Sequence, residues 1–339
     1  MTDLTTRLGT LELANPVLTA AGCGGTGREL ARFFDLARLG AFTTTSVMLR
    51  PRAGRPTPRV AETPSGVLTA MGLPGPGVDS FLETDLPWLA EQQVPVIVSV
   101  AGHSLEEYAE VARRAQESPA VAAVEVNLAA PNVEDRGRMF GRLPGPAADV
   151  VRAVRAVTRR DAPVLAKLAP DVSDLVTIAL ACVDAGADGL SLINTMAGLA
   201  IDPHTLRPTL AGVSGGLSGP AIRPVALRCV YEVHAALPGT PIVGIGGVAT
   251  GLDALEFVLA GASAVAVGTT LFHDPTAGPR IARELEEALS ARRIGRLADA
   301  VGLAHRLPPQ GHVGHVPPQI SPPPGADERR TEESKEKLP

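Results

Sequence analysis

Short apolar runs alternate with amphipathic stretches through most of this chain. Eight of the runs are apolar nearly throughout, which is typical of parallel strands buried on both faces. The predicted strands are Pro16–Ala20, Ala41–Val47, Val94–Ala101, Ala122–Asn127, Pro163–Leu168, Gly189–Asn194, Pro241–Ile245 and Ala264–Val267. The predicted helices are Gly27–Leu39, Ser104–Glu117, Ala147–Arg159, Ser173–Ala185, Pro220–Ala236 and Leu252–Ala260. Strand–helix units repeated eight times in roughly 290 residues predict an α/β fold, a single closed (β/α)8 or TIM barrel, rather than an open doubly wound sheet.

The pattern ends near residue 305, where the composition changes. The prolines Pro322–Pro324 precede the charged run Asp327–Lys337, and such a segment cannot bury a core. We therefore expect a barrel over residues 1–305 and a Pro-rich, then charged, disordered tail over residues 306–339. His312 and His315 lie in that tail, where solvated side chains are expected rather than metal ligands, and no metal site is predicted.

The composition narrows the class of function. Hydrophobic residues make up 45% of the 339, enough for a large core, and aromatic residues make up 3%, too few for a base-stacking surface. A net charge of -5 provides no overall attraction for nucleic acid. The sequence contains no apolar span of about 18 residues, so no membrane helix is predicted. The three cysteines have neither metal-ligand nor disulfide spacing. We expect a cytoplasmic protein that binds neither nucleic acid nor membrane.

The first glycine-rich stretch, Gly22–Gly27, has the spacing of a dinucleotide-binding motif. It follows a predicted strand and begins a predicted helix. A dinucleotide-binding fold also needs an acidic residue about twenty positions later to bind the ribose. Residues Ala41–Arg50 contain no Asp or Glu. We therefore interpret Gly22–Gly27 as a close-approach turn over the mouth of the barrel.

Three later glycine loops predict a phosphate site. Ser214–Pro220 opens a helix, Ile245–Val248 closes the seventh strand, and Val267–Thr270 closes the eighth. Glycines after strands seven and eight of a barrel leave backbone N–H groups free to bind a phosphate, and helix dipoles add positive potential. The three loops together indicate a ligand that carries a phosphate.

Residues 1–305, the predicted barrel, contain a single lysine. The sequence has three lysines, and Lys335 and Lys337 lie close to its end. Lys167 ends the fifth predicted strand, at the same rim as the glycine loops. A lysine beside the N1/O2 edge of a flavin stabilises the negative charge of the reduced ring, and a planar guanidinium cannot replace a compact ammonium there. A phosphate-binding, Schiff-base or surface lysine remains open as an alternative.

These features, with several longer motifs, resemble the class 1 dihydroorotate dehydrogenases, especially the 1B type, over about residues 4–305. The motifs are Asn15–Gly22, Pro58-Arg59 with Glu62-Thr63, Asn194-Thr195, Gly216–Ile222 and the two late glycine loops. The resemblance implies a TIM barrel that contains FMN. The flavin contacts that it implies are Ala21, Ser46, Ser99, Asn127, Lys167, Ile193, Gly219, Gly246, Gly247, Gly268 and Thr269.

The resemblance also implies that the substrate half of the site has changed. The family's strand-two lysine, which contacts flavin and substrate, is Thr45 here, and the asparagine of its substrate loop is Thr69. The family's base is a cysteine that removes a proton from dihydroorotate; this chain has Ala130 there, which cannot titrate. The implied substrate positions are Thr45, Thr69, Met71, Gly72, Leu73, Asn127, Asn132, Asn194 and Thr195.

Four other side chains are candidates to replace the base. His103 and Asp135 follow strands three and four, and each is expected to face solvent. Tyr108 and Tyr231 lie in helical patterns and are expected to pack.

We therefore predict an FMN-dependent oxidoreductase that exchanges hydride at a CH–CH or C=C bond of a small planar unsaturated substrate other than dihydroorotate. Lys167 and Asn132 are the predicted catalytic residues. One alternative is dihydroorotate oxidation with a displaced or absent base, and another is a non-catalytic subunit, with or without flavin. By analogy with the 1B type, we expect a homodimer and a separate iron–sulfur/flavin electron-transfer subunit.

Overall fold

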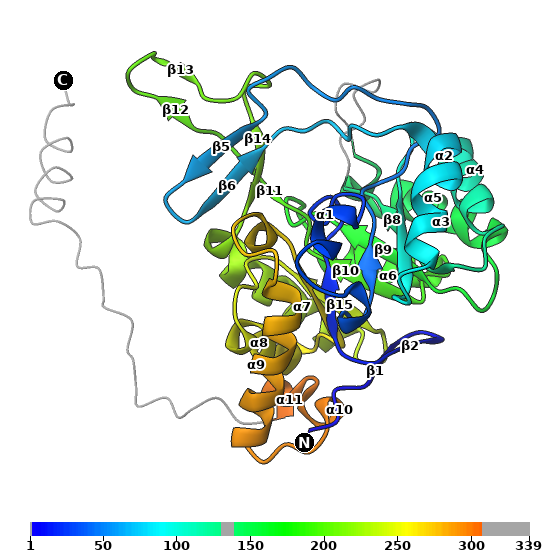
Figure 1. Cartoon of the computed structure of the whole chain (residues 1–339), viewed down its shortest axis with the longest axis vertical. Helices are drawn as coiled ribbons and strands as arrows, with labels where there is room; N and C mark the ends of the chain where they lie inside the picture. Colours follow the sequence, from blue (N-terminus) through cyan, green and yellow to red (C-terminus); the bar gives the residue numbers. More distant parts are fainter. Residues whose placement is uncertain (1, 130–138, 307–339) are drawn as a thin grey trace, which may run out of the picture. The chain divides into compact units, whose positions relative to one another are not determined.

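The computed structural model describes residues 2–129 and 139–306. Eight parallel strands pair in the order β3–β16–β15–β10–β9–β8–β7–β4, and a parallel bridge between Leu18 and Ala41 links the two ends (Figure 1). The strands are β3 (Val17–Thr19), β4 (Phe42–Thr43), β7 (Val96–Val100), β8 (Val121–Asn127), β9 (Val164–Leu168), β10 (Gly189–Leu192), β15 (Ile242–Ile245) and β16 (Ala264–Val267). Each lies within or overlaps a predicted run, so the (β/α)8 barrel is confirmed.

Helices follow most strands and form the outer layer. The main ones are α4 (Leu105–Ala115), α5 (Pro144–Val157), α6 (Leu175–Asp184), α7 (Arg223–Ala236), α8 (Gly251–Ala260) and α9 (Ala277–Ala291). Side-chain caps fix several starts: Ser104, Asp174 and Thr250 each accept a hydrogen bond from a backbone N–H in the first turn. The prediction lacked α9 and the segment of α2 (Gly77–Ser80), η2 (Phe81–Asp85) and α3 (Leu86–Ala90).

The helix predicted over Gly27–Leu39 was wrong. Only α1 (Arg28–Ala31) and a 3-10 turn, η1 (Leu36–Arg38), form there. The side chain of Asp35 accepts a hydrogen bond from the N–H of Ala37 and so starts a new turn. A local side-chain bond of this kind competes with continuation of a helix.

A second, antiparallel sheet lies over the carboxyl end of the barrel (Figure 1). Its strands pair in the order β11 (Met196–Gly198), β14 (Gly215–Ser218), β6 (Gly66–Thr69) and β5 (Val60–Thr63), and β12 (Ile201–Asp202) pairs with β13 (Arg207–Pro208). The prediction that Ser214–Pro220 is simply a loop was therefore wrong, because most of it is β14. This sheet carries the predicted substrate position Thr69 and leads directly into Gly219.

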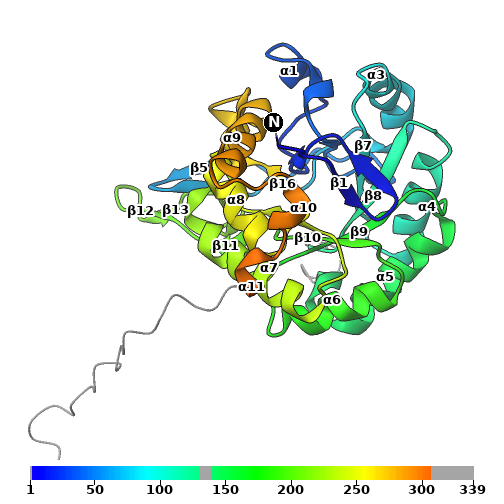
Figure 2. The same ribbon diagram turned by 90° about the horizontal axis from the view of Figure 1, so that it is seen from below.

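The barrel interior changes from apolar to polar along its strands. Side chains that point inward recur at every second residue of a strand. Toward the amino end they are apolar, as at Ile97, Ala123 and Leu165, and they pack in one cluster with Leu8 and Leu13. Those two leucines come from the hairpin of β1 (Thr6–Leu8) and β2 (Leu11–Leu13), which crosses this end of the barrel in Figure 2. The closed end leaves the carboxyl end as the place for chemistry.

The barrel and its additions form one compact unit, Met1–Arg306. The tail predicted over residues 306–339 lies almost wholly outside the described residues and stays a prediction. Within residues 2–129 and 139–306, no helix is long and apolar enough to cross a membrane. The same residues contain no group of three or more His, Cys, Asp or Glu side chains placed to hold a metal ion.

The last described helix, α11 (Leu303–Arg306), is held by an aromatic and histidine cluster. The ring of His305 stacks on Tyr231 at 3.8 Å between centroids and lies 4.9 Å from His234. The Nε2 atom of His305 is 2.9 Å from the carbonyl oxygen of Ala260. Tyr231 therefore packs, as predicted, although 43% of it stays exposed.

This cluster predicts a pH-dependent stability. Burial, aided by the positive charges of His305 and Arg306, lowers the pKa of His234. The pKa of this histidine in the unfolded chain is about 6.5. As the pH falls below that value, the unfolded chain takes up a proton more readily than the folded one, so the free energy of unfolding decreases. We expect the free energy of unfolding to fall less steeply below that pH in His234→Gln than in the natural chain. His204→Gln, on an exposed turn, is the control; equal slopes for all three proteins would contradict the account.

Candidate active site

The turn Gly22–Gly27 joins β3 to α1 at the mouth of the barrel. Gly22, Gly25 and Gly27 have φ values of 84°, 59° and 91°, which favour glycine. At Gly24 an added Cβ would lie 2.7 Å from the ring of Phe42. The glycines therefore serve a tight turn against the barrel wall, as predicted, and the closed barrel excludes a dinucleotide-binding sheet.

Three polar side chains join inside the barrel mouth. The hydroxyls of Ser46 and Ser99 are 2.9 Å apart, and the amide of Asn127 donates to the Ser46 hydroxyl at 2.9 Å. All three residues are buried. The hydroxyl of Tyr108 donates to the backbone carbonyl of Asn127 at 2.8 Å, which fixes the end of β8 from behind. Tyr108 is thus a packing residue, as predicted, that also positions Asn127.

The amide oxygen of Asn127 has no hydrogen-bond partner among the described residues, although it is buried. Leaving such an acceptor unpaired costs about 1–3 kcal/mol. A donor from a ligand in the mouth would remove this cost. The network therefore presents an acceptor that suits an N–H group of a bound ring.

Lys167 forms a buried ion pair with Glu125. Their side chains are each 4% exposed, and Lys167 Nζ lies 3.5 Å from Glu125 Oε1. The strand register places Lys167 between Asn127 of β8 and Ser191 of β10, whose hydroxyl is buried without a partner among the described residues. A buried ammonium with donors to spare, beside two unpaired polar groups, is placed to meet a polar ligand edge.

Two members of this cluster were missed by the sequence prediction. Glu125 and Ser191 are polar residues inside otherwise apolar strands, Val121–Asn127 and Gly189–Leu192. Glu125 also lies two positions before Asn127, on the same face of the strand. This spacing was a usable signal, because a buried charge almost always has a partner.

Cys23 lies close to Lys167 and to the last glycine loop. Its sulfur is 3.4 Å from the position that a Cβ at Gly268 would take. Burial raises the pKa of the Cys23 thiol to about 11, and the nearby charge of Lys167 lowers it in part. The group is therefore a neutral thiol at physiological pH.

Glycines from three loops meet on the far side of the mouth. Gly219, Gly246 and Gly247 have φ values of 95°, 133° and 72°. A Cβ at Gly247 would lie 2.8 Å from the carbonyl oxygen of Gly219, so only glycine allows these loops to approach. Thr269 donates from its hydroxyl to the Ser218 hydroxyl at 2.8 Å, which joins the loop after β16 to the same cradle.

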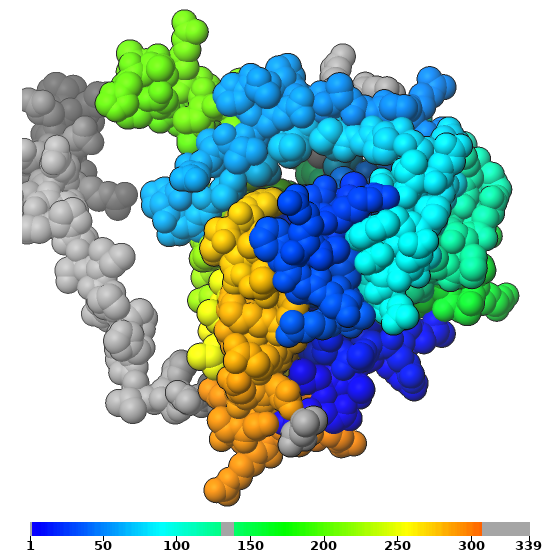
Figure 3. Space-filling model, viewed as in Figure 1, coloured from blue at the N-terminus to red at the C-terminus, as the bar shows by residue number. Residues whose placement is uncertain are grey.

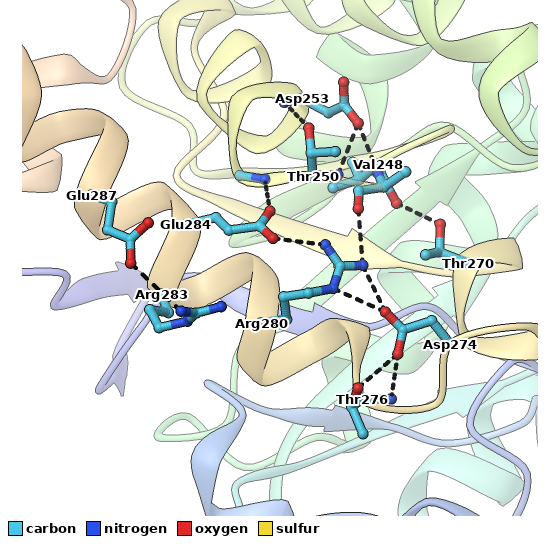
Figure 4. Close-up of polar contacts among 12 residues, drawn as sticks. Val248, Thr250, Asp253, Thr270, Asp274, Thr276, Arg280, Arg283, Glu284 and Glu287 are labelled. Atoms are coloured by element: carbon cyan, nitrogen blue, oxygen red, sulfur yellow. Dashed lines mark hydrogen bonds and ion pairs between the residues drawn. The ribbon is translucent and has the colours of Figure 1, made fainter.

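A polar network behind the cradle ties the two late loops together (Figure 4). Thr270 donates from its hydroxyl to the carbonyl oxygen of Val248 at 2.9 Å. Arg280 of α9 donates to the carbonyl oxygen of Ala249 at 3.2 Å and pairs with Asp274 and Glu284. These contacts hold the loops after β15 and β16 in a fixed relation before any ligand binds.

The predicted substrate positions collect at the same mouth. Thr69 ends β6 opposite Gly216 of β14, and Thr195 packs against Gly216. Gly72 and Leu73 follow with φ values of 76° and 51°, and Met71 is exposed. The N–H of Asn194 donates to the carbonyl oxygen of Leu168. Asn132, Ala130 and Asp135 lie outside the described residues.

Thr45 and Leu73 line a cavity of about 200 Å³ beside Ser46. Figure 3 shows this face of the molecule, with a hollow between the dark-blue segment that contains α1 and the lighter blue segment before α2. The Thr45 hydroxyl lies 3.4 Å from the carbonyl oxygen of Gly25. His103 was expected to face solvent; it is partly buried, and its Nε2 atom lies 2.7 Å from Nη1 of Arg52.

Comparison with known proteins identifies the family. The family model described as dihydroorotate dehydrogenase matches residues 3–289. The catalytic subunit of dihydroorotate dehydrogenase B (NAD(+)) from Pelobacter propionicus is 50% identical over 300 residues, which cover 88% of this chain and 98% of the relative. The protein of the same name from Desulforudis audaxviator is 52% identical over 296 residues, covering 87% and 95%. The chain belongs to the dihydroorotate dehydrogenase family.

The family assignment gives the cofactor. Members of the dihydroorotate dehydrogenase family are FMN-dependent flavoproteins, so the prediction of FMN is confirmed. The residues present fit this group. At Gly219, Gly246 and Gly247 an added Cβ would lie 2.8 Å from a neighbouring protein atom, so the backbone of the cradle stays bare. Asn127 and Ser191 have buried polar atoms without partners among the described residues. Lys167 supplies a positive charge between them.

The remaining predicted flavin contacts surround the same mouth. Ala21 lies in the turn after β3, Gly268 follows β16, and Ile193 follows β10. The N–H of Ile193 donates to the carbonyl oxygen of Ile245 at 3.0 Å, and the peptide bond before it is cis. Ala21, Ile193 and Gly268 therefore all follow the carboxyl ends of barrel strands, and their contacts with the cofactor stay a prediction.

Proposed function

We propose that this chain is an FMN-dependent oxidoreductase that exchanges hydride at a CH–CH or C=C bond of a substrate other than dihydroorotate. One observation carries the proposal: the cofactor-binding side of the barrel mouth keeps the family's residues, and the substrate-binding side does not. The cofactor half contains the buried Lys167–Glu125 pair, the glycine cradle and the Ser46–Asn127 bond. In the substrate half, Thr45, Thr69 and Ala130 lack the ammonium, carboxamide and thiol that dihydroorotate chemistry uses in the family.

Each part of the site has a proposed role. Gly219, Gly246, Gly247, Gly268 and Thr269 would hold the phosphate, because their backbone N–H groups can approach it closely. Lys167 would stabilise negative charge on the ring, and Glu125 holds its ammonium in place. When bound, FMN supplies hydride transfer at its N5 atom.

The substrate would be oriented by hydrogen bonds. Asn127 and Asn194 lie at the ends of β8 and β10, and Asn132 is the third proposed member. Amide groups can bind the carbonyl or amide of a planar substrate. Fixing that plane over the ring is a large part of what an active site contributes to such a reaction.

We propose that neither Cys23 nor His103 takes the place of the family's cysteine base. Cys23 has a pKa of about 11, so it is a neutral thiol that cannot accept a proton near pH 7. The Nε2 atom of His103 faces the guanidinium of Arg52, which is a donor only. We propose that water or the substrate itself handles the proton, which suits reduction of a C=C bond.

Dihydroorotate oxidation is the second candidate, and the names of the relatives favour it. Proteins about 50% identical to this chain are named catalytic subunits of dihydroorotate dehydrogenase B (NAD(+)). The word subunit also supports a separate electron-transfer partner, which we propose for this chain together with a homodimer. A non-catalytic role without flavin is less well supported, because the buried ion pair and the cradle would then have no ligand to bind.

Reoxidation of the reduced flavin tests the proposed reaction. The FMN-loaded protein is photoreduced without oxygen, and unsaturated amides and acids are added singly. We expect at least one compound with an activated C=C bond to restore the oxidised flavin spectrum, with one equivalent of saturated product. A panel that leaves the flavin reduced, while orotate reoxidises it rapidly, would favour the second candidate.

A further inference from the structure

The cavity behind Thr45 has the features of an anion subsite. It lies between the end of β4, the turn before α1 and the segment of α2 and α3. Among the described residues, its charged lining consists of Glu29, Asp85, Arg50 and Arg52. The two acids and the two arginines differ in how far their polar atoms are already hydrogen-bonded.

Both carboxylates are occupied. Glu29 accepts hydrogen bonds from the N–H and the hydroxyl of Thr26 at 2.9 and 3.0 Å. Asp85 accepts from Arg28 at 2.6 Å. Among the described residues, neither acid forms an ion pair or hydrogen bond with Arg50 or Arg52.

The arginines have donors left over. No hydrogen bond or ion pair joins the side chain of Arg50 to another residue that the structure describes. Nε of Arg52 is buried and has no hydrogen-bond partner among the described residues. Nη1 of Arg52 lies 2.7 Å from His103 Nε2. Backbone hydrogen bonds with Gly75, at 2.8 and 3.0 Å, fix Arg52 at the cavity wall. A fixed guanidinium with free donors matches a carboxylate, which it can bind with two parallel bonds.

The remaining lining sets the shape of the ligand. Phe42, Phe81 and Leu89 give the cavity an apolar wall, and Thr45 and Ser46 open it toward the flavin contacts. The family's lysine is replaced by the shorter Thr45, which leaves this route open and removes that lysine's contact with the substrate. An anion on a short apolar arm would reach Arg50 and Arg52 instead.

We propose that the substrate carries a carboxylate, on an arm of one or two carbons beyond its C=C bond, that binds Arg52 and Arg50 in this cavity. The inference rests on the proposed function for the identity of the reacting bond, but the subsite is defined by its own residues. Arg52 is the main anchor because it is partly buried, and Arg50 is an exposed second contact.

A matched pair of acids tests the subsite. Crotonate and trans-glutaconate share a C=C bond and a conjugated carboxylate, and glutaconate has a second carboxylate in place of one methyl hydrogen. Binding to the FMN-loaded protein is measured by calorimetry and by the flavin difference spectrum. We expect glutaconate to bind about 10- to 100-fold more tightly than crotonate, as charge-assisted hydrogen bonds predict. Arg52→Gln should abolish this preference.

Two further variants keep the test decisive. Arg50→Gln, at an exposed position that cannot disturb the core, should weaken glutaconate about two- to fivefold. Arg32→Gln makes the same change on the exposed end of α1 outside the cavity and should change neither affinity. Equal binding of the two acids, no binding of glutaconate, or a preference that survives Arg52→Gln would overturn the proposal.

The outcome is separable from that of the proposed reaction. If glutaconate binds through Arg52 but no unsaturated compound reoxidises the flavin, the subsite stands and the proposed function fails. If unsaturated compounds react without any dependence on a second carboxylate or on Arg52, the reaction stands and the subsite fails.

Discussion

Replacing Ala130 by cysteine is expected to raise the rate at which dihydroorotate reduces the bound flavin by about 10²- to 10⁴-fold, the usual contribution of a positioned general base. The substitution is made together with Thr45→Lys and Thr69→Asn, which restore the ammonium and carboxamide of the family. The reference is the double variant with Ala130 unchanged. Anaerobic stopped-flow measurement of flavin bleaching gives the two rates.

The pH dependence identifies the new group as a base. A thiol must lose its proton to act, so the rate of the triple variant should rise with pH toward a thiol pKa of about 8.5. Ala130→Val in the same background adds volume without a titratable group and should show no such rise. Equal rates for the cysteine, valine and alanine proteins would mean that position 130 is not where this chain lost its base.

Lys167→Met is expected to make the reduction potential of the bound flavin more negative by about 30–60 mV. A hydrogen bond to a charged group contributes about 1.5–3 kcal/mol, and 30 mV equals about 1.4 kcal/mol for a two-electron couple. The same change should weaken FMN binding about tenfold or more. Potentiometric titration and FMN release give the two values.

The buried partner of Lys167 requires a control. Removing the lysine alone leaves the Glu125 carboxylate, with its side chain 4% exposed, unpaired, which costs about 3–5 kcal/mol. The double variant Glu125→Gln/Lys167→Met avoids that cost and should keep the shift in potential while regaining most of the stability. The flavin reduction potential of Glu125→Gln alone should stay closer to that of the natural chain than the potential of Lys167→Met or of the double variant. An unchanged potential in a folded Lys167→Met protein would refute the role of the lysine.

Much of the barrel could be predicted because its strands are local features. A strand buried on both faces is an apolar run, and seven of the eight strands appear as such runs. The run Ala41–Val47 is instead rich in threonine. The rim positions followed from the runs, since the residue that ends a parallel strand lies at the carboxyl edge. Lys167 and Asn127 were found in this way, and the register places them side by side.

The sheet over the mouth and the cavity could not be predicted, because they depend on contacts between residues far apart in the sequence. The sheet over the mouth joins Ser218 to Val67, 151 positions apart, through short strands rich in glycine, and no local pattern predicts that pairing. In the α1 region the local pattern predicted too much, since it indicated one helix over Gly27–Leu39. The hydrogen bond that the Asp35 side chain accepts from Ala37 starts a separate turn there. The cavity with Arg50 and Arg52 arises from three segments and could not be predicted from any one of them.

The central claim is that the cofactor half of this site is kept while the dihydroorotate half has been replaced. It is tested most directly by adding dihydroorotate without oxygen to the purified, FMN-loaded natural chain and following the visible flavin spectrum. We predict one FMN per chain and a flavin that stays oxidised for at least about 10²-fold longer than in the triple variant. Rapid bleaching of the natural chain, at the rate of the variant with cysteine at position 130, would contradict the claim.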